Sequence, residues 1–478
     1  MNSRYRFAPS PTGNLHLGTL RAALFNWLLA QKKSEDVFVC RIEDTDRQRS
    51  ETGFESSIFE GLAWLGLHCD ESPLQGGDRG PYRQSERTMF YAEHIQKLLD
   101  QGLAYYCFST ASELDDEREA AKKAKKPYVY SGKYRNYPLD KAKARLAAGE
   151  KAVLRFKMPQ QGSVTVSDLI RGEVTFDYAL IGDFVIQKSD GSPAFNFAVV
   201  VDDALMKITH VIRGEDHLSN MPRQLALFDA FGYPAPQFAH LPMILGPDKS
   251  KLSKRHGATN VMDYQKQGFL PEAMLNYLAL LGWTPSDGQE KMALSDLIKV
   301  FSIKGINKSG AVFDLKKLTW LNGLYIRDLS TQEFKQGVLP FLDQESQDLL
   351  AQRYDEAQLD AIMTLAQSSL HLLAEIKDFI CVFIEDDEAV QSRRQELGFV
   401  AEQHAFLGLL KAKLIELPDK VSADDMASLL AVIVDETGLG KGKVFRPIRI
   451  AVTGFQSGPD LMQVLALLGP RVLSKRLG

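Results

Sequence analysis

The sequence predicts an α/β half with a parallel sheet and an α+β insertion, followed by an all-helical half. Its 478 residues are too many for one hydrophobic core and indicate several domains. Near the start, strand-like runs such as Asp36–Ile42 alternate with helix-like runs such as Phe54–Leu67, which is typical of a parallel α/β layer. From Leu270 onward, apolar residues recur mostly at helical spacing.

The middle of the chain combines a lysine-rich, helix-prone stretch, Ala111–Tyr128, with several strand-like runs. We expect strands in "AVLRFKM" and in "SVTVSDLIRGEVTF" because β-branched and aromatic residues dominate both. For the same reason we expect strand structure through Asp183–Asp203, "DFVIQKSDGSPAFNFAVVVDD".

Composition limits the class of protein. Hydrophobic residues make up 45% and charged residues 25%, as in an ordinary globular protein. No apolar run is long enough to span a bilayer, and the start lacks the pattern of a signal peptide, so we expect a cytoplasmic protein. The four cysteines lie far apart without a CxxC pair, which fits reduced thiols. A net charge of −4 argues against a surface that is basic overall but leaves room for a local nucleic-acid site.

The loop Ala8–Gly18 follows a short strand and leads into a helix that we expect to start near Thr19. Two prolines stiffen the loop, and Gly13 and Gly18 let a ligand approach the backbone. A strand, a loop and a helix N-terminus in this order can receive a phosphate, with His16 as side-chain donor. The loop matches neither GxxxxGK[ST] nor GxGxxG. A Pro/Gly turn with a surface histidine is the alternative.

A second cluster lies in "GPDKSKLSKRHG", Gly246–Gly257, where a Gly-Pro turn leads into Lys249, Lys251, Lys254 and Arg255. Alone, such a short charge run is usually a solvated loop. Together with the phosphate loop, it offers ammonium groups that could stabilise charge developing on a polyphosphate.

These two stretches carry a resemblance. "HLGT", His16–Thr19, resembles the HIGH signature, and "KLSKR", Lys251–Arg255, resembles the KMSKS signature of class I aminoacyl-tRNA synthetases. Further blocks in the same order are similar to bacterial-type glutamyl-tRNA synthetases: "RFAPSPTG", "RIEDTD", "GPYRQSER", "VIRGEDH", "VFDLKKLTWLNGLYIR" and "FRPIRIAVTGFQSGPDLMQVLALLG".

The resemblance implies a ligase that joins L-glutamate to the 3′ end of tRNA(Glu) through a glutamyl-adenylate, using ATP with Mg²⁺. It implies His16, Lys251 and Lys254 as catalytic residues, with Gly18 and Ser253 also at the ATP site. No side-chain nucleophile is needed, so catalysis would consist of positioning and electrostatics.

For glutamate, the resemblance implies that Arg6 and Arg213 hold carboxylates and that Glu43 holds the α-amino group, with Ala8 and Ser10 lining the pocket. An arginine suits a planar carboxylate because it donates two parallel hydrogen bonds. A structural ion pair is the alternative for each arginine. This chain departs from the family at Phe195, where a tyrosine is often found, and we expect Phe195 to form a wall of the pocket.

A second departure concerns zinc. Many bacterial members bind zinc in the insertion through a CxC pair and a later Cys/His pair. Here the first pair reads Cys107–Phe108–Ser109, and the later region offers Tyr134 and Asn136. A single thiolate cannot make a closed tetrahedral site. We therefore expect no structural zinc.

The resemblance also implies a domain order. We expect a Rossmann-like catalytic domain over 1–83 and 193–245, an inserted acceptor-end-binding domain over 84–192, a linking helical domain with the lysine loop over 246–327, and helical anticodon-binding domains over 328–382 and 383–478. The helical second half argues against a glutaminyl-tRNA synthetase, which uses β-barrels there, and against the truncated paralogue that modifies tRNA(Asp). A catalytically silent tRNA-binding relative would not need both signatures intact, and a small nucleotidylyltransferase would not need a helical half of this size. Both fit this chain less well.

The last expectation concerns which tRNA is charged by this chain, which we expect to act as a monomer. Discriminating members place an arginine against the third anticodon base, and the corresponding position here is Ser369 in "AQSSLHLL". A serine offers a short hydroxyl in place of a wide fork of donors. The hypothesis is that tRNA(Gln) is also glutamylated, with an ordinary helical serine as the alternative.

Overall fold

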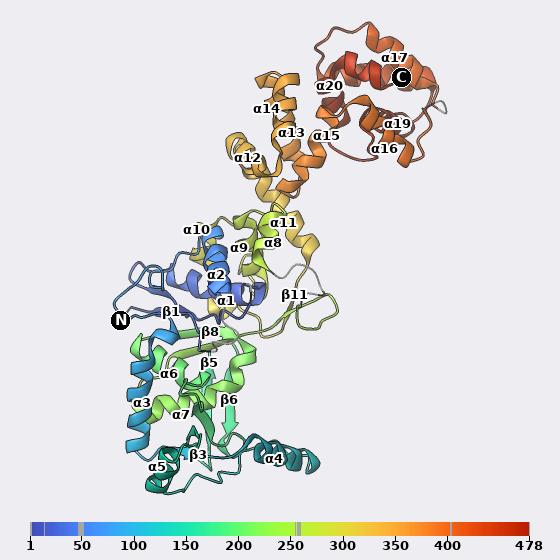
Figure 1. The fold of residues 1–478 in the computed structure, drawn as a ribbon. Coiled ribbons are helices and arrows are strands. Elements are labelled where there is room, and N and C mark those ends of the chain that lie inside the picture. The colour runs from blue at the N-terminus through green and yellow to red at the C-terminus, as the bar shows by residue number, and fades with distance from the viewer. Residues whose placement is uncertain are drawn as a thin grey trace. The chain divides into compact units, whose positions relative to one another are not determined.

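The computed structural model describes residues 2–13, 15–45, 52–253, 255, 260–401 and 404–477 (Figure 1). The chain forms two compact units. The first contains Met1–Asp263 with Met274–Asp314, and the second contains Tyr264–Ala273 with Leu315–Gly478. The division passes through the predicted linking region, and the finer domain boundaries stay a prediction.

A four-stranded parallel sheet with the order β2-β1-β8-β9 forms the centre of the first unit, as predicted. Its strands are β1 Arg4–Phe7, β2 Val37–Cys40, β8 His210–Gly214 and β9 Gln237–Leu241. Helix α1, Leu17–Ala30, connects β1 to β2 and buries most of its side chains against β1 and β8. The loop before α1 therefore opens at the carboxyl end of β1, where ligands bind in open parallel sheets.

The insertion contains an antiparallel sheet with the order β3-β4-β7 and a separate hairpin, β5–β6. The hairpin packs on the central sheet, where Leu169 N donates to Phe238 O of β9 at 2.8 Å (Figure 1). The strands are β3 Ala104–Cys107, β4 Val153–Phe156, β5 Ser163–Asp168, β6 Gly172–Asp177 and β7 Phe184–Gln187. The neighbouring helices are α3 Thr88–Asp100, α4 Ala111–Lys123 and α5 Leu139–Ala147.

One predicted strand region is wrong in its second part. Strand structure covers Phe184–Gln187, but Phe195–Leu205 forms helix α6. This helix is buried along Phe197–Asp203, and its segment Phe197–Val201 is an unbroken apolar run rather than a helical stripe. Such a run cannot be told from a buried strand by periodicity.

The remaining elements of the first unit surround the sheet. They are α2 Thr52–Trp64, α7 Met221–Phe231, α10 Leu294–Val300 and the parallel pair β10 Ile244–Leu245 and β11 Ala311–Val312. Two helices, α8 Val261–Lys266 and α9 Pro271–Leu280, each contribute residues to both units.

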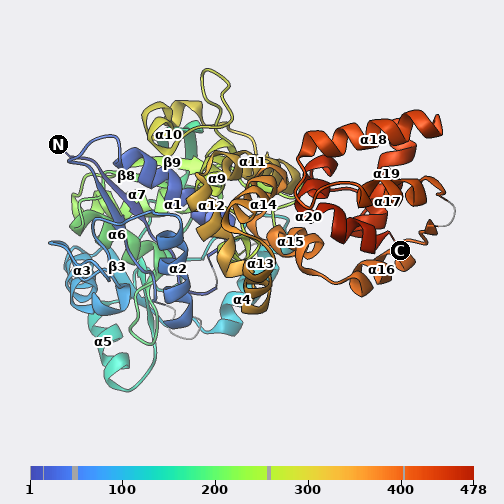
Figure 2. The same ribbon diagram turned by 90° about the horizontal axis from the view of Figure 1, so that it is seen from above.

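The second unit is helical, as predicted (Figure 2). It has its own apolar core. Its helices are α11 Leu315–Asp328, α12 Thr331–Val338, α13 Gln344–Arg353, α14 Glu356–Ser369, α15 Ile376–Ile384, α16 Asp387–Glu396, α17 Phe406–Ile415, α18 Ala423–Thr437, α19 Lys441–Thr453 and α20 Leu461–Arg476. Across the described ranges, no helix is long and apolar enough to cross a membrane.

Candidate active site

The loop predicted to bind phosphate is organised by His16, which is the N-cap of α1. Its Nδ1 accepts a hydrogen bond from Thr19 N at 3.2 Å, so the helix begins two residues earlier than predicted. A Cβ placed on Gly18 would lie 3.3 Å from His16 Nδ1. The glycine thus leaves room for the imidazole ring. Burial and the nearby Lys251 lower the pKa of His16, which keeps it neutral at pH 7.

A cavity of about 770 Å³ opens above this loop. It brings together most of the predicted site residues from segments far apart in the sequence: Arg6, Ala8, His16, Gly18, Arg213, Lys251 and Ser253 all line it. Lys251 reaches it from the lysine loop, with its Nζ 3.8 Å from Asp216 Oδ2. Lys254 lies outside the described residues.

Three predicted glutamate-pocket residues do not line this cavity. Ser10 is exposed on the loop, and Glu43 is buried next to Arg41. The Phe195 ring lies 5.6 Å from the ring of His217, which does line the cavity. Phe195 therefore contacts a residue of the cavity wall but does not line the cavity itself.

Arg213 has an unusual environment for a buried arginine. It is 7% exposed, its Nε donates to His240 Nε2 at 3.0 Å, and its Nη2 donates to Gln224 Oε1 at 2.9 Å. Both partners are neutral, and none of the described carboxylates forms an ion pair with it. Burial and the nearby Arg6 lower the pKa of Arg213 to about 9. An anionic ligand in the cavity would stabilise this guanidinium.

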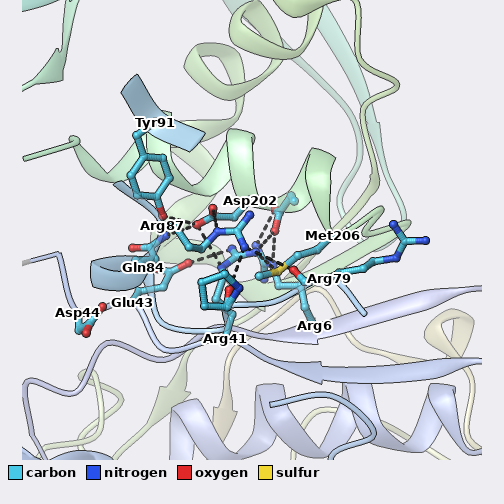
Figure 3. Close-up of polar contacts among 12 residues, drawn as sticks. Arg6, Arg41, Glu43, Asp44, Arg79, Gln84, Arg87, Tyr91, Asp202 and Met206 are labelled. Carbon is cyan, nitrogen blue, oxygen red and sulfur yellow. Dashed lines mark hydrogen bonds and ion pairs between the residues drawn. The ribbon is translucent and has the colours of Figure 1, made fainter. Parts of the chain in front are cut away.

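Arg6, in contrast, is held by a buried acid (Figure 3). Its Nε lies 3.3 Å from Asp203 Oδ1, and the same oxygen accepts from Arg41 Nη1 at 2.7 Å. Burial raises the pKa of Asp203, but the two guanidinium groups outweigh it, so the pKa is lowered overall. Arg41 also donates to Glu43 Oε1 at 3.0 Å. Burial raises the pKa of Glu43, which the two arginines only partly offset.

Asp202 continues this buried network on its other side. It accepts hydrogen bonds from Arg87 Nε at 2.6 Å, Gln84 Nε2 at 2.8 Å and Tyr91 Oη at 2.9 Å (Figure 3). Sequence reasoning assigned no role to Asp202, Asp203, Arg41 or Arg87. These four charged residues have little or no exposed surface, and burying them lowers the stability of the fold unless each charge is paired. The network holds Arg6 and Glu43 in fixed positions.

In the insertion, the residues at the positions where many family members bind zinc make other interactions. The Tyr130 hydroxyl lies 3.2 Å from both Cys107 Sγ and Ser109 Oγ. The guanidinium of Arg145 stacks 3.9 Å from the centre of the Phe108 ring. No group of three or more His, Cys, Asp or Glu side chains that could hold a metal is found in the part of the chain that the structure describes. These residues do not fit a zinc ion, and its absence stays a prediction.

Ser369 is the last residue of α14 and is half-buried. Its Oγ donates to Leu365 O at 2.8 Å, as helical serines often do. Its role in tRNA discrimination stays a prediction.

The fold and the cavity define a class I tRNA synthetase. Residues 3–320 match the family described as tRNA synthetases class I (E and Q), catalytic domain, and residues 333–478 match the family described as anticodon binding domain. The chain belongs to the glutamate–tRNA ligases of this class, because its curated relatives match it over almost their whole length.

Two of these relatives illustrate the match. The glutamate–tRNA ligase of Carboxydothermus hydrogenoformans is 43% identical over 99% of this chain and 98% of its own. That of Heliobacterium modesticaldum is 46% identical over 98% of this chain and 94% of its own. The crystal structure of a glutamate tRNA ligase from Elizabethkingia meningosepticum, in complex with its amino acid, is similar with a TM-score of 0.84 and 33% identity, covering 100% of this chain and 98% of that one.

Proposed function

We propose that this ligase joins L-glutamate to tRNA(Glu) through a glutamyl-adenylate and that the cavity above α1 is where the adenylate forms. The observation that carries the assignment is Arg213, a buried guanidinium at the cavity wall whose described partners are neutral. Arg213 binds a carboxylate of glutamate, and Arg6, fixed by Asp203, binds beside it.

ATP occupies the part of the cavity between the phosphate loop and the lysine loop. His16 donates to a phosphate, Gly18 leaves room for the nucleotide, and Lys251 and Lys254 stabilise the charge that develops on the α-phosphate. Ser253 lines the same wall.

Mg²⁺ enters with the ATP phosphates, since this cation keeps several waters and takes few protein ligands. Asp216 on the cavity wall is a carboxylate within reach of that region, as its 3.8 Å distance from Lys251 indicates. The ion would offset negative charge on the phosphates.

The remaining glutamate contacts rest on the resemblance of the sequence motifs rather than on the cavity wall, because Glu43, Ser10 and Phe195 do not line the cavity. Glu43 receives the α-amino group, because it is a buried carboxylate that gains a cation by binding it. Ala8 lines the cavity, Ser10 is exposed on the same loop, and Phe195 supports the wall through His217.

The test is the variant Arg213→Lys, assayed by pyrophosphate exchange with tRNA present. A lysine keeps the charge but loses the bidentate geometry, so the KM for glutamate rises about a hundredfold while the KM for ATP changes little. Arg4→Lys is the matched control, because Arg4 lies on the same strand as Arg6 and pairs with Glu71 outside the cavity. Equal changes in both KM values, or none, would refute the assignment.

We further propose that the ligase also glutamylates tRNA(Gln), that it acts as a monomer in the cytoplasm, and that the insertion over 84–192 holds the acceptor end of the tRNA. Support for the first point is Ser369, whose short side chain cannot supply an arginine's fork of donors.

A further inference from the structure

The neutral partner of Arg213, His240, lies directly opposite it in the central sheet. Strands β8 and β9 pair in parallel with Arg213 in register with His240. The two side chains meet through Arg213 Nε and His240 Nε2, 3.0 Å apart. An arginine Nε always carries a hydrogen and can only donate. His240 Nε2 must therefore be the unprotonated nitrogen that accepts.

The other ring nitrogen of His240 faces Asp168 at the end of strand β5. His240 Nδ1 lies 2.7 Å from Asp168 Oδ2, and both side chains are fully buried. The second oxygen, Oδ1, accepts from the backbone amides of Ile170 and Arg171 at 2.9 and 2.8 Å. Asp168 thus has no freedom to turn, and its carboxylate can only accept a hydrogen from Nδ1.

The chain of donors and acceptors fixes one tautomer of His240. The carboxylate of Asp168 requires the hydrogen on Nδ1, and Arg213 requires the lone pair on Nε2. The opposite tautomer would place a hydrogen against Arg213 Nε–H and leave Asp168 Oδ2 without its donor from His240. Protonated histidine fails in the same way at Arg213, and burial lowers the pKa of His240, which disfavours that form at pH 7.

Contacts from the insertion also hold the hydrogen-bonded chain of Asp168, His240 and Arg213 in place. Arg171, in the turn of the β5–β6 hairpin, donates from Nε to His240 O at 3.4 Å and pairs with Glu215. Glu215 in turn accepts from Met243 N at 2.8 Å. The hairpin thereby connects the insertion to the strand that carries His240.

We propose that Asp168 and His240 are positioning residues for glutamate binding, in which Asp168 sets the tautomer of His240 and His240 orients the guanidinium of Arg213. The inference rests on the proposed role of Arg213 as a carboxylate ligand. It assigns a function to two buried residues that lie 72 positions apart in the sequence.

The test is Asp168→Asn, which keeps the size of the side chain. The amide oxygen of the variant takes over the backbone amides, so its NH₂ group faces His240 Nδ1 and forces the hydrogen onto Nε2. The resulting clash of two donors displaces Arg213. We expect the KM for glutamate to rise about ten- to a hundredfold, as for other residues that orient a binding group, while the KM for ATP stays within about twofold.

A spectroscopic readout separates this role from a structural one. In ¹⁵N-histidine NMR, with the signal assigned by His240→Gln, the wild-type ring should carry its hydrogen on Nδ1 and the Asp168→Asn ring on Nε2. Thr165→Val is the matched control, because Thr165 lies on the same strand and its hydroxyl bonds to the exposed Thr175 at 2.8 Å. It should change neither readout.

The outcomes are distinct. A hydrogen on Nε2 in the wild-type enzyme would overturn the proposal, even if Asp168→Asn fails to fold. So would an unchanged KM for glutamate in Asp168→Asn, or equal increases in both KM values. If Arg213→Lys leaves glutamate binding intact, the proposed function itself fails, whichever tautomer is found.

Discussion

His16 has two tasks that a mutation can separate. It caps α1 through Nδ1, and it lines the cavity where ATP is proposed to bind. Alanine removes both functions, while asparagine is a good N-cap residue and removes only the imidazole. The pair of variants therefore distinguishes a loss of chemistry from a loss of structure.

We expect His16→Asn to keep the stability of the wild type and to slow adenylate formation by about a hundred- to a thousandfold, because it removes a phosphate donor. His16→Ala should be equally slow and also less stable by about 1 kcal/mol. Pyrophosphate exchange with tRNA present and urea unfolding measure the two effects. Full activity in His16→Asn would contradict the phosphate-loop assignment.

The buried acid Asp203 offers a second test. Asp203→Asn leaves Arg6 and Arg41 without their shared carboxylate charge, so we expect a loss of about 3–5 kcal/mol in the free energy of unfolding. The pKa of Asp203 is lowered in the folded protein. Its contribution is therefore complete above its unfolded pKa of about 4 and is lost as the pH falls through the lower folded value.

Urea unfolding at pH 7 and at lower pH checks both statements. The gap between wild type and Asp203→Asn should persist to pH 5, about one unit above the unfolded pKa, and shrink below it. Asp190→Asn in an exposed turn serves as control, with almost no effect at pH 7. A gap that widens in acid would contradict the sign of the pKa shift.

At the level of residues, the sequence pointed to several that line the cavity and missed those that hold them in place. His16 and Lys251 belong to compact motifs with a recognisable order of residue types. Asp168 and His240 are brought together only by the packing of a hairpin on a sheet. No local pattern marks a residue whose partner is fixed by tertiary structure.

Among the elements, the insertion has a hydrogen-bonded tyrosine, Tyr130, beside the residues that stand where many family members bind zinc. Tyr130→Phe keeps the ring, over which Arg155 stacks at 3.9 Å, and deletes only the hydroxyl shared by Cys107 and Ser109. We expect a loss of about 1 kcal/mol, seen as a lower Tm. Tyr128→Phe, which removes a half-exposed bond to Glu117, is the control and should cost less.

The same region predicts the metal content. Cys107 is the one thiol at this position and is hydrogen-bonded to Tyr130. We therefore expect no zinc by elemental analysis and no change in Tm on adding a chelator. One zinc per chain would refute this prediction.

Elements with a clear period were predicted correctly, whereas α6 was not. Strand β1 and helices such as α14 and α18 are found where their sequences indicated. Helix α6 is buried along Phe197–Asp203, and even its two charged residues there, Asp202 and Asp203, are buried, so no exposed polar face marks its period. Burial on all sides removes the signal on which such predictions depend.

For the whole molecule, the prediction concerns the choice of tRNA. If Ser369 fails to reject the larger third base of the tRNA(Gln) anticodon, Ser369→Arg should lower charging of tRNA(Gln) and leave tRNA(Glu) charging nearly unchanged. Ser368→Arg, at the exposed neighbouring position, is the control. Charging of both purified tRNAs at one salt concentration is the measurement. A wild-type preference for tRNA(Glu) of about a thousandfold, ~4 kcal/mol, would contradict the hypothesis.

The segment Tyr264–Ala273 belongs to the second unit although it lies in the sequence between two parts of the first, and this has a consequence for the gene. Leu270 N donates to Asn322 Oδ1 at 2.8 Å, and Gly268 O accepts from Leu373 N, so this segment is hydrogen-bonded into the second unit. A fragment that stops at Asp314 carries the segment without its partners, and a fragment that starts at Leu315 has the partners without the segment. Recombination with a relative at a single crossover near Asp314 therefore separates Leu315–Gly478 from Tyr264–Ala273, which belongs to the same unit. A chimera that takes its anticodon-binding half from a relative must therefore also take Tyr264–Ala273 from that relative.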